Sequence, residues 1–513
     1  MGGDPHLPGE DVGSMTPSAP DHGVTGKGLA AGKLGLLPST VIGLGSTAPL
    51  YSLAATLGFV VMAVGAQAPI ALIVAFVPMC LTAFAYRELN TAVPDAGTAF
   101  TWAAKALGPR TGWFAGWGAF VSGVIVMSSQ TQVASRYLLL LVGGETLADS
   151  PVIVTSLGAV IIAVMTWVSF RAVEAGAKAQ YALMALQYMA IIAFCIGLWL
   201  AISDDRHALD FSWEWFNPFA ADNPVGFMQA VLLAIFMYWG WDTCLSLAEE
   251  TKNPRTTPGL AALLSTVCLL VTYVGMTALA MMYAGVGTEG KGLANPDGAE
   301  DVFFSLREDT LGSYGWVLVF AIFVSALSTC QTTILPQARA TFAMGIYKAL
   351  PRRFAHINPK YQTPGFSTIF MGVVSAAFYV GMTILSGDIL ADTIESTSLA
   401  VAMYYALTSL ACILYFRKHL FDSARNVVFR LVMPLLGGLM MTAVFVYSAI
   451  NMFDPDYGTT TLLGTSGTFV MGVGSLALGL VVMFVWMRFA EARPYFEGRT
   501  LNRDTEVLVP ETP

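Results

Sequence analysis

Charged residues are scarce in this sequence. Only 12% of its 513 residues are Asp, Glu, Lys or Arg, whereas soluble domains carry about one quarter, and 55% are hydrophobic. The mean hydropathy is +0.64. This composition argues against a soluble enzyme, and it excludes a disordered chain, which needs low hydrophobicity. The composition predicts a polytopic membrane protein.

Cysteine and the common catalytic motifs are also scarce or absent. Six cysteines in 513 residues are too few for a disulfide scaffold, and all six fall in apolar runs, where we expect reduced packing residues. The sequence has no GxxxxGK[ST] loop, no nucleophile and base pair and no metal-ligand spacing. We therefore expect no enzyme, no cofactor, no metal site and no nucleic-acid partner, and any pumping must use an ion gradient.

Long apolar runs dominate the rest of the chain. A membrane-spanning helix needs about 20 apolar residues, because hydrocarbon cannot satisfy exposed backbone N–H and C=O groups. These continuous runs argue against a porin-like barrel, whose strands are about 10 residues long and alternate apolar with polar residues. We predict an all-α membrane protein with twelve spans, near residues 37–63, 69–86, 113–134, 152–170, 181–202, 226–247, 260–284, 315–341, 366–386, 393–416, 427–450 and 467–489.

The basic residues predict the orientation of these spans. With both termini on one side, 22 of the 26 Lys and Arg residues fall on that side, and four fall on the other: Arg136, Arg206, Lys291 and Arg307. Because basic loops stay in the cytoplasm, we expect both termini there, in a plasma (inner) membrane. We expect a disordered N-terminal tail over residues 1–33, a similar tail over 490–513, a transport core over 34–416 and two further helices over 417–489.

Two spans contain helix-breaking residues at a comparable depth. The first has Gly43, Gly45 and Pro49 within an apolar run, and the sixth has Gly240 followed by Asp242. Proline removes a helical donor, glycine lowers the cost of leaving the helix, and a buried acid is costly. This pairing predicts two inverted repeats of five helices, with a substrate held between the broken helices. The alternative is that Gly and Pro only kink or pack these helices.

Several stretches resemble the amino acid/polyamine/organocation permeases. They are FAYREL at 84–89, VPDAGT at 93–98, ALG at 106–108, WGWD at 239–242, AEETKNPR at 248–255, RATFAM at 339–344, ALP at 349–351 and TP at 363–364. The resemblance covers about residues 34–416. It implies the leucine-transporter type of fold, five plus five inverted helices with two more at the C-terminus, and transport of an amino acid or amine.

The resemblance assigns the substrate to the two breaks, with one departure in the first. Many such permeases bind a carboxylate at a Gly-X-Gly, where this chain has Pro49, Leu50 and Tyr51. Proline lacks an N–H, and a proline here also resembles bacterial putrescine importers. The N–H groups of Ser46, Thr47 or Leu50 are alternative carboxylate donors. The expected binding residues are Gly43, Gly45, Ser46, Thr47, Pro49, Tyr51, Tyr238, Trp239, Gly240 and Trp241.

The second departure concerns the coupling ion. Gln187 falls where some family members place a lysine that substitutes for sodium, and glutamine cannot titrate. Asp242 is then the proton candidate, the alternatives being a gate that pairs with another helix or a structural partner. Ser325, Ser328 and Thr329 offer hydroxyl ligands for sodium or simply bond to backbone. Tyr238, Trp239 and Trp241 can surround an ammonium, although helix geometry lets only one or two face a cavity.

Other acidic residues lie near the ends of predicted spans. We expect Glu395 to reach the lipid headgroups, the alternative being a place on the outer vestibule. We expect Glu88, Glu249 and Glu250 to be solvated, the alternative being ion pairs that hold an inner gate shut.

The sequence therefore predicts a permease that imports an amino acid by alternating access, driven by protons or possibly by Na⁺. A polyamine or organic amine permease, or an exchanger, is the alternative, and a non-transporting sensor is a remote one. The expected partners are a small-molecule substrate, the coupling ion and the lipid bilayer. The oligomeric state is not predicted.

Overall fold

The computed structural model describes residues 34–171, 174–221, 223–296, 300–386 and 388–506, together with Gly32 and Gly298. The N-terminal tail predicted over residues 1–33 lies outside the described residues, apart from Gly32.

The described chain is mostly helical. Eleven of its stretches are long and apolar enough to cross a membrane, and the first, Leu36–Ala92, includes three helices over 57 residues, where the sequence predicts two spans. The long helices are α1 Leu36–Thr47, α2 Pro49–Val64, α3 Ala68–Ala92, α5 Pro109–Leu141, α7 Pro151–Arg171, α8 Glu174–Ser203, α9 Pro224–Tyr238, α11 Thr257–Ala284, α13 Gly315–Ile346, α14 Gly365–Leu385, α15 Ile389–Tyr415, α17 Met433–Met452 and α19 Ser475–Trp486.

Short elements connect these helices. They are η1 Gly65–Gln67, α4 Ala99–Leu107, α6 Glu145–Ala148, η2 Trp213–Phe216, η3 Pro218–Ala220, α10 Thr243–Ser246, η4 Ala248–Glu250, α12 Val302–Leu311, η5 Gly312–Tyr314, η6 Arg352–Ala355, α16 Ala424–Asn426, α18 Gly467–Phe469, α20 Arg493–Phe496, and the π-helical turns η7 Val427–Val432 and η8 Val470–Gly474. Strands β1 (Thr461–Leu462) and β2 (Thr465–Ser466) form an antiparallel hairpin.

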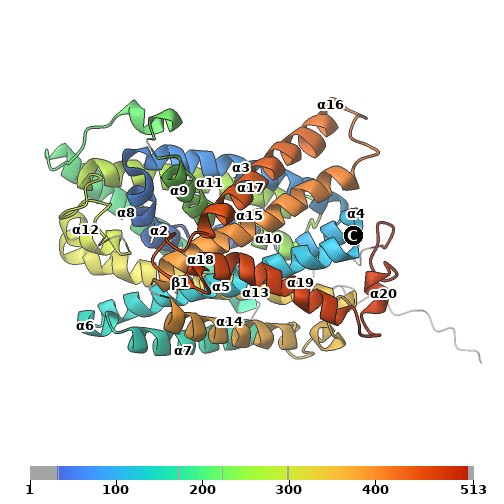
Figure 1. Ribbon diagram of the computed structural model, residues 1–513. Coiled ribbons are helices and arrows are strands. Elements are labelled where there is room, and N and C mark those ends of the chain that lie inside the picture. Colours follow the sequence, from blue (N-terminus) through green and yellow to red (C-terminus); the bar gives the residue numbers. More distant parts are fainter. Residues whose placement is uncertain are drawn as a thin grey trace, which may run out of the picture.

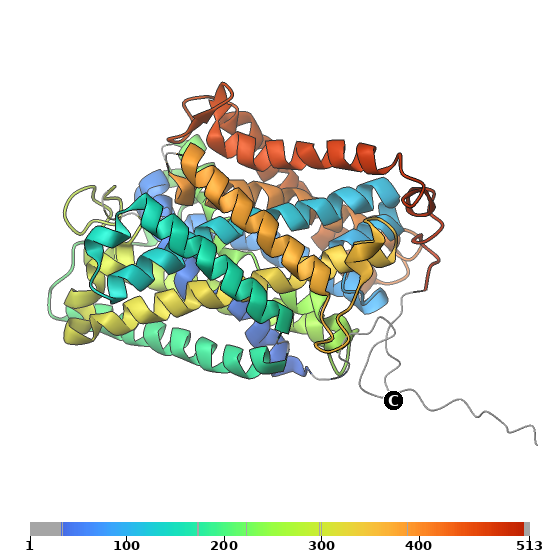
Figure 2. The ribbon, with the colours of Figure 1, turned by 90° about the horizontal axis from the view of Figure 1, so that it is seen from below.

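The long helices lie side by side and end at two opposite faces. Figure 1 shows α4 and α20 at one end, which we call the tail face, and α6 and α12 at the other, which we call the loop face. Leu34 pairs with Thr251 at the tail face, so the described N-terminal residues begin there. The turned view shows the same side-by-side arrangement (Figure 2).

The helices divide into an inner and an outer set. Most of α5, α9, α13 and α15 is buried, whereas α7, α14 and α17 expose much of their apolar surface. Large apolar side chains such as Val373, Ile384, Leu439 and Ile450 lie on that exposed surface. An apolar surface of this extent fits contact with lipid. Helices α13 and α15 both pack on α5 in the interior, and α2 packs on α9.

The described C-terminal residues pack on the tail face, so the prediction of an unstructured tail is wrong for residues 493–506. Tyr495 and Leu501 are fully buried. The ammonium of Lys105 donates to the carbonyls of Asn502 and Thr505, and the Thr500 hydroxyl donates to the Tyr347 carbonyl at 2.6 Å. Burial lowers the pKa of Lys105. The polar composition predicts disorder, but the buried side chains of Tyr495 and Leu501 pack this segment against the tail face.

Candidate functional site

The first predicted span consists of two helices joined at Ala48. Helix α1 ends at Thr47 and α2 begins at Pro49, and Ala48 between them has a left-handed conformation with φ +47° and ψ 72°. Pro49 explains the break, because a proline disfavours right-handed helical geometry in the preceding residue and has no N–H to donate. The break lies where the sequence predicts it.

The sixth predicted span is broken as well. Helix α9 ends at Tyr238 and α10 begins at Thr243, with Trp239 extended and Gly240 at φ +120° between them. A Cβ on Gly240 would lie 2.8 Å from the Ser46 carbonyl carbon and 2.9 Å from the Thr47 nitrogen. The two breaks therefore touch, and only glycine satisfies both the positive φ and this close approach.

A small cavity lies between the breaks and the tail face. Its volume is about 30 Å³, which is room for about two water molecules. The break residues Ser46, Trp239 and Gly240 line one side, and the tail-face half of α13 lines another. The full lining is Ser46, Thr98, Ala119, Trp239, Gly240, Asp242, Thr243, Ser246, Thr333, Pro336, Gln337, Ala340 and Tyr404.

A hydrogen-bond chain orients Asp242 at this cavity. Nε1 of Trp239 donates to the Tyr404 hydroxyl at 2.6 Å, and that hydroxyl donates to Oδ2 of Asp242 at 3.1 Å. The Ser46 and Thr243 hydroxyls lie 2.7 Å apart beside them. No Lys, Arg or His is among the residues that line the cavity. The site therefore contains a half-buried carboxylate with no basic side chain beside it.

The other predicted aromatic residues pack in the core. The Trp241 ring lies 5.2 Å from that of Tyr86 and 5.3 Å from that of Tyr405. Tyr238 packs on Tyr273 at 5.2 Å, and Tyr51 donates its hydroxyl to Ser129 at 3.0 Å. Of the predicted aromatic residues, the structure brings Trp239 to the cavity and places Tyr51, Tyr238 and Trp241 away from its lining.

The start of α2 offers few N–H groups to an anion. Pro49 has none, Tyr51 donates its N–H to the Ser325 hydroxyl at 3.2 Å, and Ser52 donates its N–H to the Ala48 carbonyl at 2.9 Å. Pro49 and Leu50 are buried and absent from the cavity lining. A carboxylate site at this helix end is therefore incomplete.

The remaining α1 residues predicted to bind substrate also make internal contacts. A Cβ on Gly43 would lie 2.8 Å from the Ser265 hydroxyl, and one on Gly45 would lie 3.0 Å from Oε1 of Gln180. The Thr47 hydroxyl donates to the Gly43 carbonyl at 3.0 Å.

Gln187 joins a neutral network between α8 and α13. The Ser325 hydroxyl donates to Oε1 of Gln187 at 2.7 Å, and the Ser328 hydroxyl donates to Oε1 of Gln180 at 2.9 Å. The Thr329 hydroxyl donates to the Gly45 carbonyl at 3.5 Å. Sequence reasoning missed Gln180, although it lies seven residues before Gln187 and so shares its helix face.

Sequence reasoning also missed Tyr404 and Gln337. Gln337 carried a usable signal, because a polar residue directly after a proline within an apolar span is costly and tends to be functional. Tyr404 carried none, since its partners are 165 and 162 positions away.

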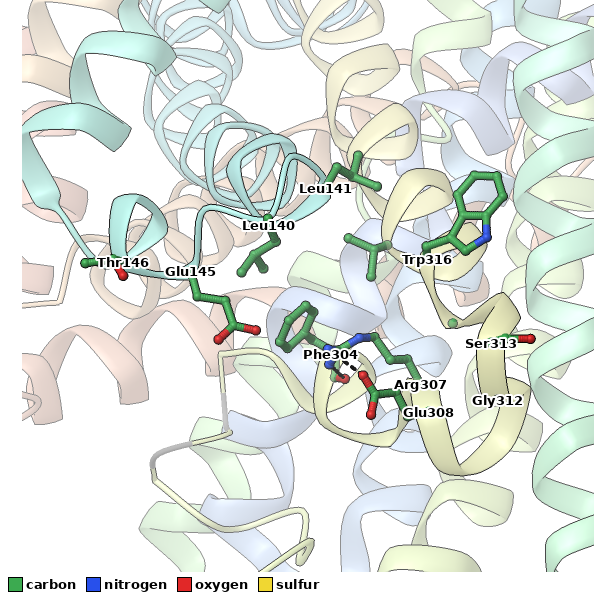
Figure 3. Close-up of a pocket in the computed structure, with 13 residues that line it drawn as sticks. Leu140, Leu141, Glu145, Thr146, Phe304, Arg307, Glu308, Gly312, Ser313 and Trp316 are labelled. Atoms are coloured by element: carbon green, nitrogen blue, oxygen red, sulfur yellow. Dashed lines mark hydrogen bonds and ion pairs between the residues drawn. The ribbon is translucent and has the colours of Figure 1, made fainter.

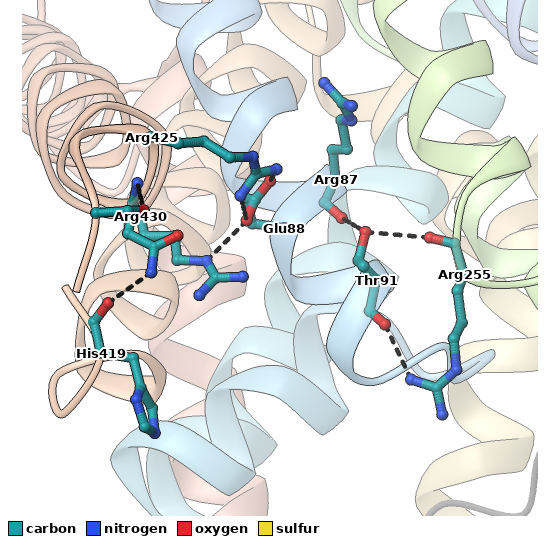
Figure 4. A network of polar contacts seen from close by, with 9 residues as sticks. Arg87, Glu88, Thr91, Arg255, His419, Arg425 and Arg430 are labelled. Atoms are coloured by element: carbon teal, nitrogen blue, oxygen red, sulfur yellow. Dashed lines mark hydrogen bonds and ion pairs between the residues drawn. The ribbon is translucent and has the colours of Figure 1, made fainter.

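Glu88, Glu249 and Glu250 are buried at the tail face, so the prediction that they are solvated is wrong. Glu250 and Arg339 form a buried pair at 2.6 Å, with side chains 5% and 2% exposed. Glu249 accepts the Ala96 N–H at 2.9 Å. The third carboxylate, Glu88, forms ion pairs with Arg425 and Arg430 (Figure 4), which lie just before α17. Long-range partners, which a local pattern does not reveal, account for these buried charges.

Ion pairs also link separate parts of the chain at the loop face. Arg136 on α5 pairs with Glu300 at 2.7 Å and with Asp301 at 2.8 Å, just before α12. Burial raises the pKa of Asp301, and the guanidinium of Arg136 opposes this shift. Glu395 is buried and accepts a hydrogen bond from Gln229 at 2.7 Å, so the prediction that it reaches the headgroups is wrong. Its partner is the side-chain amide of Gln229 on α9.

A second, open groove of about 770 Å³ lies at the loop face, between the ends of α5 and α12 and the start of α13. Figure 3 shows Arg307 and Glu308 paired there beside Phe304. No residue of either helix break lines this groove. Within the described ranges, no group of three or more His, Cys, Asp or Glu residues is placed to hold a metal ion.

Known proteins resemble this chain over most of its length. It is 26% identical over 362 residues to "Cationic amino acid transporter 3, mitochondrial" of Arabidopsis thaliana, covering 66% of this chain and 57% of that relative. It is 24% identical to the methylthioribose transporter of Bacillus subtilis, covering 68% and 74%, and 22% identical to that organism's branched-chain amino acid permease BcaP, covering 67% and 73%. The chain thus spans little more than half of the plant relative.

A solved structure has the same fold. The structure of MhsT in complex with L-phenylalanine superposes with a TM-score of 0.56 at 15% identity, covering 81% of this chain and 99% of MhsT. This agrees with the predicted inverted-repeat architecture with broken helices. The family model described as "Amino acid permease" matches residues 34–473. The chain belongs to the amino acid permease family.

Proposed function

We propose that this chain is a secondary active transporter of a small organic cation, a basic amino acid or an amine, whose ammonium group pairs with Asp242. The observation that carries the proposal is the Asp242 carboxylate, which lines the cavity at the helix break with no basic side chain beside it. A charge in such a place is costly unless it is paired, so it requires a proton or a cation.

The relatives support a transporter and leave its substrate open. The Arabidopsis relative is named for cationic amino acids, but relatives of similar identity are named for methylthioribose and for branched-chain amino acids. The incomplete donor set at the start of α2 favours substrates that do not depend on a bound carboxylate.

We further propose that protons drive transport and that Asp242 carries them. A proton and a substrate ammonium then occupy Asp242 in turn, so the substrate and the proton cross the membrane in opposite directions and transport is an exchange. The network around Gln187 contains only hydroxyl and amide groups, which cannot titrate. Among the residues that line the cavity, Asp242 is the side chain that can bind and release a proton near neutral pH.

Transport by alternating access fits the closures at both faces. In this proposal the Arg136 contacts open to admit substrate from the loop face, and the Glu250–Arg339 pair opens to release it at the tail face. We assign the tail face to the cytoplasm because 22 of the 26 basic residues belong to its side of the predicted topology. The plasma membrane is our proposal for the location, although the Arabidopsis relatives are named as mitochondrial or vacuolar.

Uptake by proteoliposomes tests the function. In vesicles with an acidic lumen, we expect the protein to accumulate radiolabelled arginine or putrescine as protons leave, and Asp242→Asn to lower uptake at least tenfold, because the ion pair is lost. Asp456→Asn, which removes an exposed carboxylate, is the matched control and should transport normally. Wild-type uptake by Asp242→Asn would contradict the role given to Asp242, and the absence of uptake of any organic cation by the native chain would contradict the proposed function.

A further inference from the structure

Helices α7 and α14 form an apolar pair at the edge of the bundle. They pack on each other and lie side by side (Figure 1). Both expose large apolar side chains, such as Trp167 on α7 and Ile369 and Val373 on α14. An apolar surface of this extent needs an apolar neighbour, which the acyl chains of a bilayer supply.

An open hollow of about 430 Å³ lies at the tail-face end of this pair. Its lining residues are Arg352 and Arg353 of η6, His356, and Phe366 in the first turn of α14, with no Asp or Glu among them. Both arginines are exposed, and within the described ranges neither guanidinium has an ion-pair partner. The carboxylate of Glu491 contacts this segment only at the backbone N–H of Arg352, at 2.7 Å. The hollow therefore carries a net positive charge.

Two further basic residues lie in the segments that join at this end of the pair. The guanidinium of Arg171, the last residue of α7, lies 4.5 Å from the centre of the Trp167 ring. The ammonium of Lys360 lies 5.4 Å from the centre of the Tyr361 ring, which in turn contacts the ring of Phe170 at 5.7 Å. These contacts bring the end of α7 and the loop before α14 together, so their basic side chains add to the charge of the hollow.

Phe366 gives the hollow an apolar wall. Its ring packs edge-on against Phe354 at 4.9 Å and stacks with Phe370 at 6.3 Å. Ile369 and Val373 follow it at spacings of three and seven residues, so all three side chains lie on one face of α14. Each of them is exposed. The basic hollow is therefore continuous with an exposed apolar stripe along the helix.

We propose that this hollow binds an anionic phospholipid, whose phosphate pairs with Arg352 and Arg353 and whose acyl chains lie along Phe366, Ile369 and Val373. A guanidinium matches the geometry of a phosphate, and basic pockets at the ends of membrane helices suit anionic headgroups. A free phosphate ion would pair with the arginines alone and would leave the apolar stripe uncovered. The inference concerns a lipid and is independent of the transported substrate.

Thermal unfolding of the purified full chain in mixed micelles tests the inference, because a lipid that binds only the folded chain raises its melting temperature. We expect phosphatidylglycerol to raise the melting temperature by about 2 °C or more relative to the same amount of phosphatidylcholine. Inorganic phosphate alone should not reproduce this rise. The double variant Arg352→Gln with Arg353→Gln should lose it, since the positive charge of the hollow is removed.

The matched control is Arg417→Gln with Lys418→Gln, which removes two exposed basic side chains that do not line the hollow and should keep the rise. Arg353→Gln alone covers the case in which the double variant does not fold, and it should reduce the rise. An equal rise with phosphatidylcholine or with inorganic phosphate would overturn the proposal. So would a rise that the Arg352 and Arg353 variants keep, or one that the control loses to the same extent.

Discussion

Individual polar residues give this apolar interior its chemistry. Asp242 is oriented by Tyr404, which is in turn held by Trp239, while the Gln337 amide lies against Gly123. Each contact joins residues that lie far apart in the sequence. A substitution at one of them therefore changes the position of a partner far away in the sequence, and its effect depends on the pair rather than on one residue.

Asp388 shows how a carboxylate outside the spans responds to pH. It precedes α15, accepts the Ala391 N–H at 3.1 Å, and burial, with a contribution from Glu300, raises its pKa to about 6. The folded chain then binds this proton more tightly than the unfolded chain, whose Asp pKa is about 3.9. The stability that protonation provides is present below about pH 4 and is lost as the pH rises through about 6.

We expect Asp388→Asn to stabilise the protein at pH 7.5 by about 1–2 kcal/mol, after allowance for solvent screening, and to have little effect near pH 4. Asparagine keeps the cap on α15 but cannot ionise. Thermal unfolding at the two pH values measures the difference. An equal change at both pH values would show that ionisation of Asp388 does not contribute.

At the scale of elements, the two helix breaks behave as one unit. Pro49 and Gly240 disrupt their own helices through local geometry, and the close approach of Gly240 to Ser46 and Thr47 then holds the breaks together. The cavity lies where this unit meets the tail-face half of α13. A change that separates the breaks should therefore affect binding more than it affects helix content.

Gly240→Ala is the matching prediction. A Cβ would meet backbone atoms at 2.8 Å in a residue with φ +120°, so we expect a loss of about 1–3 kcal/mol of stability and at least tenfold weaker binding of putrescine or arginine. Gly275→Ala on α11 is the control, because a Cβ there meets nothing within 4 Å. Thermal unfolding and equilibrium binding give the two readouts. Native affinity in Gly240→Ala would mean that the contact between the breaks does not shape the site.

At the scale of the whole molecule, charged contacts hold the helix bundle together at its two faces. The Glu250–Arg339 pair is almost completely buried, and the C-terminal residues 493–506 cover the same face. A buried pair adds little net stability compared with apolar residues, but removing one partner leaves a charge that water cannot reach. The tail face is therefore sensitive to single substitutions and tolerant of paired ones.

We expect Arg339→Leu to lower the free energy of unfolding by about 3–5 kcal/mol, because it leaves the buried Glu250 carboxylate without a cationic partner. The double variant Arg339→Leu with Glu250→Leu should recover most of that loss. Denaturant unfolding of the single and double variants measures the coupling. A double variant as unstable as the sum of its single substitutions would show that the two residues act independently.

The sequence by itself determined the features that depend on local chemistry. Apolar runs predicted the spans, and Pro49 and Gly240 predicted the two breaks, because backbone geometry and the absence of water in hydrocarbon act within a few residues. The motif resemblance agreed with the family and the fold. Tertiary structure alone decided which side chains reach the cavity, bringing Trp239, Tyr404 and Gln337 there and leaving Trp241 in the core. It also decided that Glu395 and the C-terminal segment are buried, because packing between distant helices selects partners that no local pattern contains.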